Sequence, residues 1–143
     1  MQLTRYTDYS LRVLMYCARK GEERSTIQEI AEFHGISQNH LVKVAHQLGR
    51  LGYLKTIRGS GGGLLIARSP YKISVGKVVR EVESNFDLVE CFNKETDQCR
   101  ITLECNLKEV IARAQRSFLE CLDKVTLAEV AGLIDPKPAH KRG

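Results

Sequence analysis

The chain has 143 residues and a formal net charge of +5, a length that suits one domain or a small domain with an appendage. Its composition, with 43% hydrophobic and 27% charged residues, is typical of a globular protein and argues against disorder. Charged residues interrupt the N-terminal apolar run and no stretch reaches roughly 18 apolar residues, so we expect a cytoplasmic protein without a secretory signal or a membrane partner.

The charge is divided unevenly along the chain. Residues 1–80 contain 13 Lys/Arg and 5 Asp/Glu, whereas residues 81–143 contain 9 and 12. A basic half of this size suggests a polyanionic partner, because each neutralised phosphate releases counterions. A solvated surface with uneven charge is the alternative.

The first predicted element is an amphipathic helix over residues 7–20. Its apolar residues recur at i, i+3, i+4 and i+7, the spacing of one helical face. We expect Thr7 or Asp8 to cap its start and Gly21 to end it.

A helix-turn-helix is predicted next. Residues 26–34 form the first helix, Gly35 supplies the turn, and Ser37 caps a third helix whose apolar residues again recur at i, i+3, i+4 and i+7. Once that apolar stripe is buried, a polar face of the third helix is left for base edges and phosphates in the major groove. With the cap, the candidate DNA-binding residues are Ser37, Gln38, Asn39, His40, Lys43, His46, Gln47 and Arg50.

A β-hairpin wing is predicted directly after the third helix. Two short runs, residues 53–57 and 64–67, flank the glycine-rich tip GSGGG. Arg58 lies at the base of this tip and Ser60 lies within it, where a wing places a cation in or beside the minor groove. The phosphate-loop motif is absent, which argues against a nucleotide-binding loop. The expected fold is therefore mainly α, a winged helix-turn-helix with a small hairpin.

The acidic half is expected to contain a short helix over residues 74–83 and a long helix from about 102 to 125. The long helix has an apolar stripe over about six turns, more than a small domain covers by itself. Packing on the chain's own N-terminal helix is one explanation, and pairing with the same helix of a second subunit is the other. Pairing would give the two-fold dimer that a palindromic DNA site requires.

Three of the five cysteines follow the short helix as Cys91-x7-Cys99-x5-Cys105. Polar residues separate them, so burial does not explain them, whereas Cys17 and Cys121 are expected in the core. Grouped thiolates bind soft or borderline metals, and the spacing lacks the Cys-x2-Cys pairs usual for zinc fingers. The chemistry favours an iron–sulfur cluster, with zinc or a thiol switch as alternatives.

Catalytic patterns do not stand out elsewhere. There is no Ser-His-Asp set, nucleophile elbow or pair of carboxylates. His34, His40 and His46 are six residues apart, so they do not share a helical face and do not suggest a metal site. We therefore expect a protein that is not an enzyme.

Taken together, these features resemble the Rrf-type family of winged-helix regulators over nearly the whole chain. The matching stretches are MQLTRYTDYSLRVLMY, GISQNHLVKVAHQLGRLGYL, RGSGGGLLIA and the three cysteines. Within the family the chain looks most like the repressors that sense nitric oxide. The family's regulators of cluster supply have a histidine three positions after the third cysteine, where this chain has Lys108.

The resemblance implies a ligand set and a mechanism. Similar repressors complete their site with a carboxylate of the other subunit from a TDY motif, which is Asp8 here. A homodimer would then hold a 4Fe-4S cluster in each subunit through Cys91, Cys99, Cys105 and Asp8 of the partner. Nitric oxide would attack the iron and displace Asp8, and palindromic double-stranded operator DNA would be released.

The expected organisation and the alternatives follow. Residues 1–83 would form the DNA-binding domain, 84–106 the cluster-binding loop, 102–134 the dimerisation helix with a short final helix, and 135–143 a disordered tail. One alternative is a regulator of the same family with a 2Fe-2S cluster that senses redox state or cluster supply. The other is a zinc- or thiol-based winged-helix protein that binds a protein partner.

Overall fold

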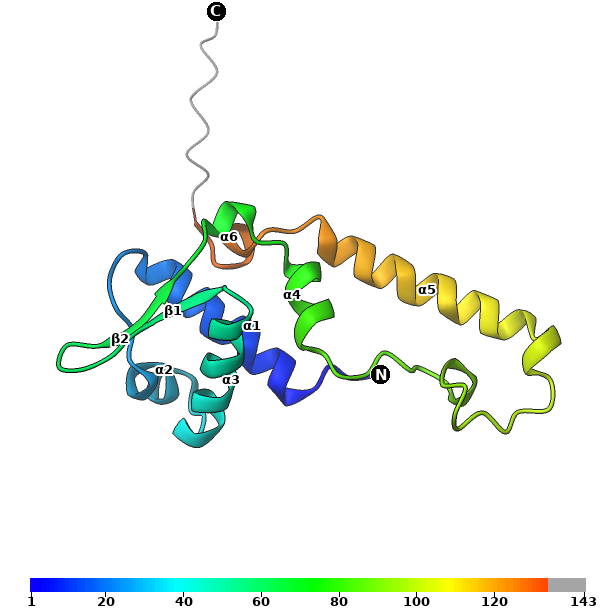
Figure 1. The fold of residues 1–143 in the computed structure, drawn as a ribbon. Helices are drawn as coiled ribbons and strands as arrows, with labels where there is room; N and C mark the ends of the chain where they lie inside the picture. Colours follow the sequence, from blue (N-terminus) through cyan, green and yellow to red (C-terminus); the bar gives the residue numbers. More distant parts are fainter. Residues whose placement is uncertain (134–143) are drawn as a thin grey trace, which may run out of the picture.

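The computed structural model describes residues 1–133, so the predicted tail over 135–143 lies outside the described residues. The described part is mainly helical with a two-stranded antiparallel sheet (Figure 1). In chain order its elements are α1 (Arg5–Lys20), α2 (Ile27–His34), α3 (Gln38–Arg50), β1 (Leu54–Ile57), β2 (Gly63–Ile66), η1 (Pro70–Lys72), α4 (Val75–Val82), η2 (Glu90–Phe92), η3 (Thr102–Glu104), α5 (Asn106–Asp123) and α6 (Leu127–Val130). None of the helices in residues 1–133 is both long and apolar enough to cross a membrane.

Helix α1 begins earlier than its apolar pattern predicts. Its N-cap is Thr4, whose side chain accepts a hydrogen bond from the backbone N–H of Thr7, so the prediction of Thr7 or Asp8 as the cap is wrong. Thr7 is instead a fully buried residue of the first turn. Gly21 ends the helix with a φ of 63°, as expected.

The helix-turn-helix is confirmed. Thr26 caps α2 in a capping box with Glu29, and Gly35 ends α2 in the left-handed conformation that allows the tight turn. Ser37 occupies the N-cap position of α3, but its side chain makes no capping hydrogen bond. The apolar side of α3 is buried as predicted, at Leu41, Val44, Ala45 and Leu48.

The wing is also confirmed, with Leu54 paired to Ile66 and Ile57 paired to Gly63. Ser25, between α1 and α2, exchanges two backbone hydrogen bonds with Leu64 and so ties the hairpin to the helices. Gly62 is required at the tip, because a Cβ there would lie 2.3 Å from the carbonyl oxygen of Ile57.

The main hydrophobic core lies among α1, α2, α3 and the hairpin. Its fully buried residues include Val13, Leu14, Ile30, Leu41 and Leu48. Helix α6 returns to this core: Leu127 is 1% exposed, and Arg19 of α1 donates a hydrogen bond to the carbonyl oxygen of Ala131. The final helix therefore packs on the N-terminal region rather than on α5 alone.

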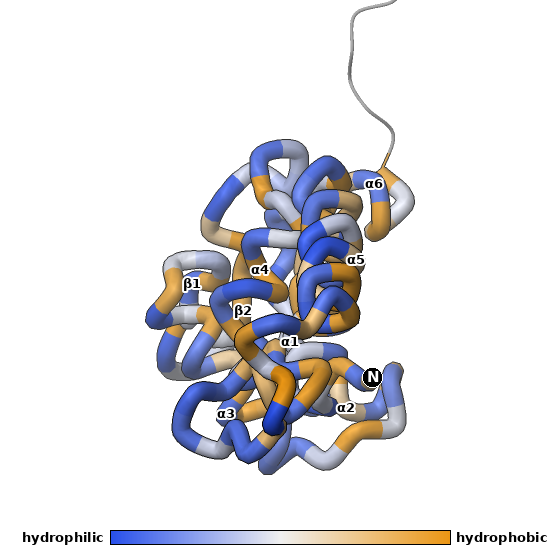
Figure 2. Tube along the Cα trace, turned by 90° about the vertical axis from the view of Figure 1, so that its right-hand side faces the viewer, coloured by the Kyte–Doolittle hydropathy of each residue, from blue (hydrophilic) through white to orange (hydrophobic). Residues whose placement is uncertain are grey.

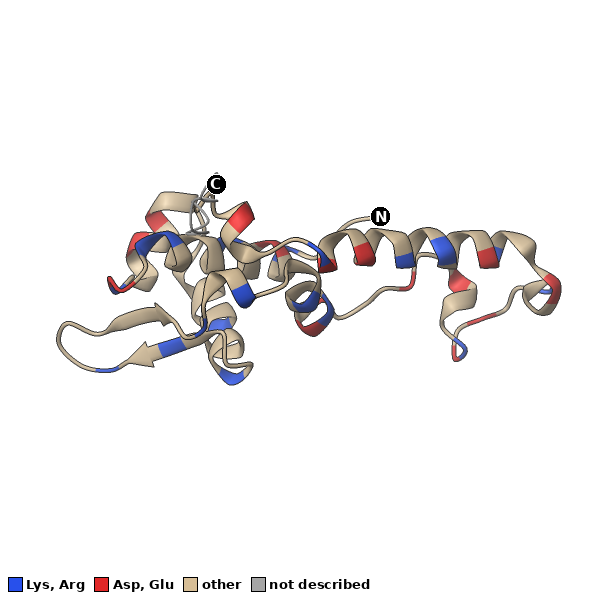
Figure 3. Ribbon diagram, turned by 90° about the horizontal axis from the view of Figure 1, so that it is seen from above, with Lys and Arg blue, Asp and Glu red and all other residues tan. Residues whose placement is uncertain are grey.

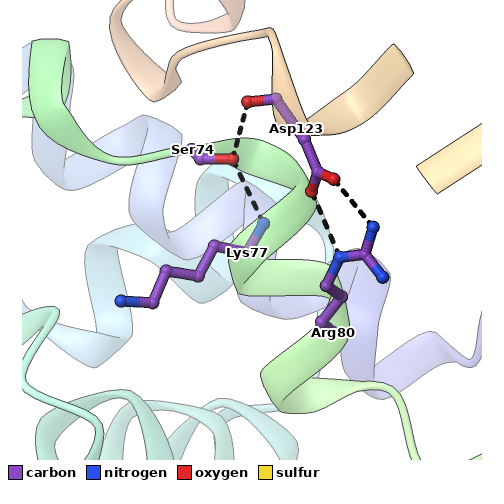
Figure 4. Close-up of polar contacts among 4 residues, drawn as sticks. All are labelled: Ser74, Lys77, Arg80 and Asp123. Atoms are coloured by element: carbon purple, nitrogen blue, oxygen red, sulfur yellow. Dashed lines mark hydrogen bonds and ion pairs between the residues drawn. The ribbon is translucent and has the colours of Figure 1, made fainter. Parts of the chain in front are cut away.

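Helix α4 joins the N-terminal region to α5 through a close contact (Figure 4). Ser74 caps α4 and donates a hydrogen bond to the backbone carbonyl of Asp123, while Arg80 binds both carboxylate oxygens of Asp123, at 3.2 and 2.7 Å. Gly76 faces the same residue, and a Cβ there would lie 2.1 Å from an oxygen of the Asp123 carboxylate. The absence of a side chain at Gly76 allows α4 and the end of α5 to approach.

The long helix is shorter than predicted. A separate 3-10 turn (η3) precedes α5, because Cys105 has an extended backbone and acts as the N-cap. Helix α5 and the cysteine loop extend away from α1, α2 and α3 (Figures 1 and 3). Within α5, Leu119 is the only buried residue.

The apolar stripe of α5 is only partly covered within the chain. Phe118 and Leu122 pack against the small buried cluster that α4 and Leu119 form, whereas Leu107 and Val110 are 64% and 48% exposed. Seen from the end of α5, hydrophilic and apolar residues lie on different sides of the helix (Figure 2). Cys121 is exposed as well, so the prediction that it is a core residue is wrong for the single chain, while Cys17 is buried as expected.

Candidate functional site

A first candidate site is the exposed face of α3. The burial of its apolar side leaves four residues along the outermost row at i, i+4, i+7 and i+11, namely Asn39, Lys43, His46 and Arg50, all of which are exposed. Gln38 and His40 are also exposed and flank the row, whereas Gln47 is half-buried. The predicted polar face therefore exists as one continuous surface with two cationic side chains.

Sequence reasoning missed an apolar member of this surface. Val42 lies beside the row and is 54% exposed. A small apolar side chain on a helix that enters the major groove suits contact with the methyl group of thymine. The sequence does contain a sign of it, because Val42 is an aliphatic residue outside the apolar stripe that α3 buries.

The wing places Arg58 and Ser60 at an exposed tip after β1. The tip is held from outside the hairpin, because Arg24 contacts the carbonyl oxygen of Gly61 through its guanidinium group. At the base, Arg68 donates hydrogen bonds to the carbonyl oxygens of Leu51 and Gly52. In Figure 3, Lys and Arg (blue) lie on the hairpin and on the neighbouring helices. The hairpin thus adds a cationic edge to the surface of α3.

Asp8 lies in the first turn of α1, close to α3. Its carboxylate forms an ion pair with Arg12 at 2.9 Å, and both side chains are about half exposed, at 46% and 42%. The guanidinium of Arg12 lies 6.0 Å from the ring of Tyr9, and that ring lies 6.3 Å from the ring of His40 on α3. Asp8 is therefore separated from α3 by only the side chains of Arg12 and Tyr9.

Glu83 connects the same turn to the cysteine loop. It ends α4, it is 8% exposed, and one of its carboxylate oxygens accepts hydrogen bonds from Thr4 N at 2.9 Å, Thr4 Oγ1 at 3.1 Å and Thr7 Oγ1 at 2.7 Å. Burial opposes ionisation of Glu83, but the hydrogen bonds from Thr7 and Thr4 outweigh it and lower the pKa of the carboxyl. Sequence reasoning missed this contact, because the partners are far apart in the chain.

The cysteine loop is built from hydrogen bonds rather than from apolar packing. The Glu90 side chain accepts a hydrogen bond from the backbone N–H of Gln98 at 2.6 Å, which links the neighbours of Cys91 and Cys99. The Asp97 side chain accepts from the N–H of Cys99 and from the hydroxyl of Thr102, both at 3.0 Å. Such local side-chain contacts hold a turn without a core.

The three loop cysteines occupy different local environments. Cys91 lies in the 3-10 turn η2 and is half-buried, Cys99 is exposed, and Cys105 caps α5. The sulfur of Cys105 accepts a hydrogen bond from the N–H of Lys108 at 3.4 Å, so it lies at the N-terminus of α5. By contrast, burial raises the pKa of Cys17 to about 11, as expected of an inert core thiol.

Within residues 1–133 the structure brings no group of three or more His, Cys, Asp or Glu side chains close enough to hold a metal ion. Asp8 lies on α1, whereas the loop cysteines precede α5 at the end of the molecule that points away from α1 (Figure 1). The donor set itself suits a soft metal centre: three thiols, accessible or half-buried, one of them at a helix N-terminus. Cys91, Cys99 and Cys105 are the residues of this loop that could hold a cluster.

Known proteins are similar to this chain in both sequence and fold. The sequence pattern of the Rrf2 family, described as an iron-dependent transcriptional regulator, matches residues 3–132. The chain is 48% identical to the HTH-type transcriptional regulator NsrR of Bacillus subtilis over 131 residues, which cover 91% of this chain and 90% of that protein. It is 47% identical to NsrR of Bacillus licheniformis over 131 residues, with 91% and 92% covered.

Two solved structures share the architecture. CymR, the global cysteine regulator of B. subtilis, has a TM-score of 0.75 and 26% identity, with 94% of this chain and 99% of that chain covered. IscR of T. potens has a TM-score of 0.73 and 26% identity, with 92% and 87% covered. These likenesses confirm the predicted winged helix-turn-helix fold, and together with the sequence match they show that the chain belongs to the Rrf2 family of transcriptional regulators.

Proposed function

We propose that this chain is a cytoplasmic, homodimeric transcriptional repressor that binds palindromic operator DNA, holds an iron–sulfur cluster and releases DNA in response to nitric oxide. The observation that carries the proposal is the contact between the turn of Asp8 and the DNA-facing helix α3. This contact offers a short physical connection between a metal-ligand candidate and the surface that would bind DNA.

DNA binding is supported by the exposed face of α3 and by the wing. The row of Asn39, Lys43, His46 and Arg50 presents hydrogen-bonding and cationic groups at the spacing of one helical face. Arg58 at the wing tip adds a cation that can enter the minor groove. Similarity to proteins named as HTH-type transcriptional regulators agrees with this reading.

A homodimer is supported by the uncovered part of α5. Leu107, Val110, Ala114 and Cys121 are exposed and recur along one side of the helix. Exposed apolar stripes of this length mark a surface that a partner covers. A second α5 would match it, and a two-fold dimer presents two copies of α3 to a palindromic duplex.

The cluster ligands would be Cys91, Cys99 and Cys105 of one subunit with Asp8 of the other. When bound, the cluster would supply an iron atom that is reactive toward nitric oxide. A carboxylate is a hard ligand and matches soft iron–sulfur chemistry poorly, so Asp8 would be the ligand that exchanges most easily. The 4Fe-4S form is the one implied by the resemblance to NsrR, and counting iron and sulfide distinguishes it from a 2Fe-2S form.

When Asp8 is not a cluster ligand, its carboxylate would form an ion pair with Arg12. In the structure the Asp8 carboxylate is held by Arg12 at 2.9 Å, and Arg12 also lies over Tyr9, which contacts His40 of α3. Movement of Asp8 between the loop of the partner and Arg12 would therefore alter the contacts of Tyr9 with α3. The proposed switch would then lie in the first two turns of α1.

The test compares Asp8→Ala with the control Asp87→Ala. Asp87 is an exposed residue with the same carboxylate side chain, at the start of the loop. Both proteins are purified without oxygen and followed by visible absorbance and by DNA binding during addition of nitric oxide. Asp8→Ala should change the spectrum and weaken DNA binding before any nitric oxide is added, whereas Asp87→Ala should behave as the wild type. If Asp8→Ala matched the wild type in spectrum, DNA affinity and nitric oxide response, the role of Asp8 would be wrong.

A further inference from the structure

A pocket lies between the N-terminal turn of α1 and the first two turns of α3. Its volume is about 260 Å³, and it is lined by Arg5, Tyr6, Tyr9, His40, Lys43 and Val44. None of the residues of α1 belongs to the predicted DNA-binding set. One of its lining residues, Lys43, is a member of the exposed row of α3.

The polar groups of the pocket are cationic or hydrogen-bond donors. Arg5 and Lys43 are exposed and line the pocket from different helices, and His40, also exposed, lines it from α3. No acidic side chain lines the pocket. This combination of groups suits a single phosphate group, because arginine and lysine can donate hydrogen bonds to it from different directions.

The walls of the pocket are aromatic and aliphatic. The rings of Tyr6 and Tyr9 and the buried side chain of Val44 form them. The hydroxyl of Tyr6 donates a hydrogen bond to the backbone carbonyl of Lys43 at 3.3 Å, which fixes α1 on α3 and keeps the pocket in shape. An apolar wall next to cationic groups suits a sugar attached to a phosphate.

We propose that this pocket binds a phosphate of the DNA backbone, with Arg5 and Lys43 as its cationic ligands. Contacts to phosphates position a protein on the duplex and carry no sequence information of their own. The site would therefore extend the DNA interface from α3 and the wing onto the first turn of α1.

This inference rests on the proposed function and deepens it. Asp8 lies one helical turn from Arg5, and Tyr9 lines the pocket while contacting both Arg12 and His40. The turn that carries the candidate cluster ligand would itself touch DNA. Displacement of Asp8 would then disturb a phosphate contact directly, in addition to any change in the spacing of the two DNA-binding heads.

The experiment measures DNA affinity as a function of salt for the wild type and for Arg5→Gln. The probes are a palindromic duplex selected from a random pool by the wild-type protein and the same duplex with scrambled half-sites. The matched control is Arg116→Gln, an exposed arginine of α5 outside the winged region. Arg5→Gln should reduce the slope of log affinity against log salt by about one for each subunit. The preference for the selected duplex should stay unchanged, and Arg116→Gln should have no effect.

A second measurement identifies the phosphate. Neutral methylphosphonates placed one at a time along the selected duplex should reveal a position at which the wild type loses more affinity than Arg5→Gln, since only the Lys43 contact remains in that variant. A wild-type slope in Arg5→Gln, or equal sensitivity of both proteins at every position, would overturn the phosphate site. Arg50→Gln and Arg58→Gln distinguish failure of the phosphate site from failure of the proposed function. If these two substitutions also left DNA affinity unchanged, DNA binding by α3 and the wing would itself be wrong.

Discussion

The N-terminal region and the arm formed by the cysteine loop and α5 are built in different ways. Helices α1, α2 and α3 enclose side chains that are fully buried, such as Leu14, Ile30 and Leu41. The arm buries little within the chain, and its loop has Leu103 at 99% exposure. The first region owes its shape to its own core, whereas the arm leaves much of its apolar surface uncovered within the chain.

The largest expected effect contrasts the two regions directly. Leu41→Ala should lower the free energy of unfolding by about 2–5 kcal/mol, because it leaves a cavity in the core of the N-terminal region. Leu103→Ala should change it by no more than about 0.5 kcal/mol, since the side chain is almost fully exposed. Urea denaturation at one fixed protein concentration measures both. Equal effects of the two substitutions would contradict the contrast between core and arm.

The junction between the regions can be broken at Gly76. An added Cβ would meet the backbone nitrogen of Asp123 at 2.5 Å, so Gly76→Ala should force α4 from α5 and cost about 1–3 kcal/mol. Gly49→Ala is the control, because its Cβ would meet its nearest neighbour only at 3.9 Å, an ordinary contact. In a helix that substitution should be neutral or slightly stabilising. A stable Gly76→Ala protein would mean that the close approach of α4 and α5 is not needed.

Glu83 supplies a smaller and pH-dependent test. Its pKa is lowered in the folded chain, so the carboxylate stabilises the fold above the unfolded pKa of about 4.3, and this stabilisation is lost as pH falls through the folded pKa. Glu83→Gln should therefore cost about 1–3 kcal/mol at neutral pH and weaken the loss of stability on acidification. Thermal unfolding between neutral and acidic pH measures this. An unchanged pH profile would show that the contacts with Thr4 and Thr7 do not stabilise the ion.

Local patterns were enough to predict the winged helix-turn-helix formed by α2, α3 and the hairpin. The spacing of Leu41, Val44, Ala45 and Leu48, the turn at Gly35 and the glycine-rich tip each specify a structure within a few residues of themselves. Their agreement explains why helix, turn, helix and hairpin were all found in place.

Features that depend on distant residues could not be predicted in this way. Helix α1 begins at Arg5 because Thr4 is held by Glu83, 79 residues away, and no local pattern signals that contact. The exposure of Cys121 and the pocket between α1 and α3 depend on how helices pack, which spacing along one helix does not specify. The proposed role of Asp8 as a cluster ligand rests on family resemblance alone.

The most direct measurement of the central claim uses the wild-type protein purified without oxygen. Its visible absorbance and its binding to a labelled palindromic duplex are recorded together during stepwise addition of nitric oxide. The account predicts a broad visible band that bleaches as the duplex is released. A colourless protein that binds the duplex with or without nitric oxide would keep the winged helix and contradict the cluster-based switch, and a coloured protein indifferent to nitric oxide would contradict the proposed signal.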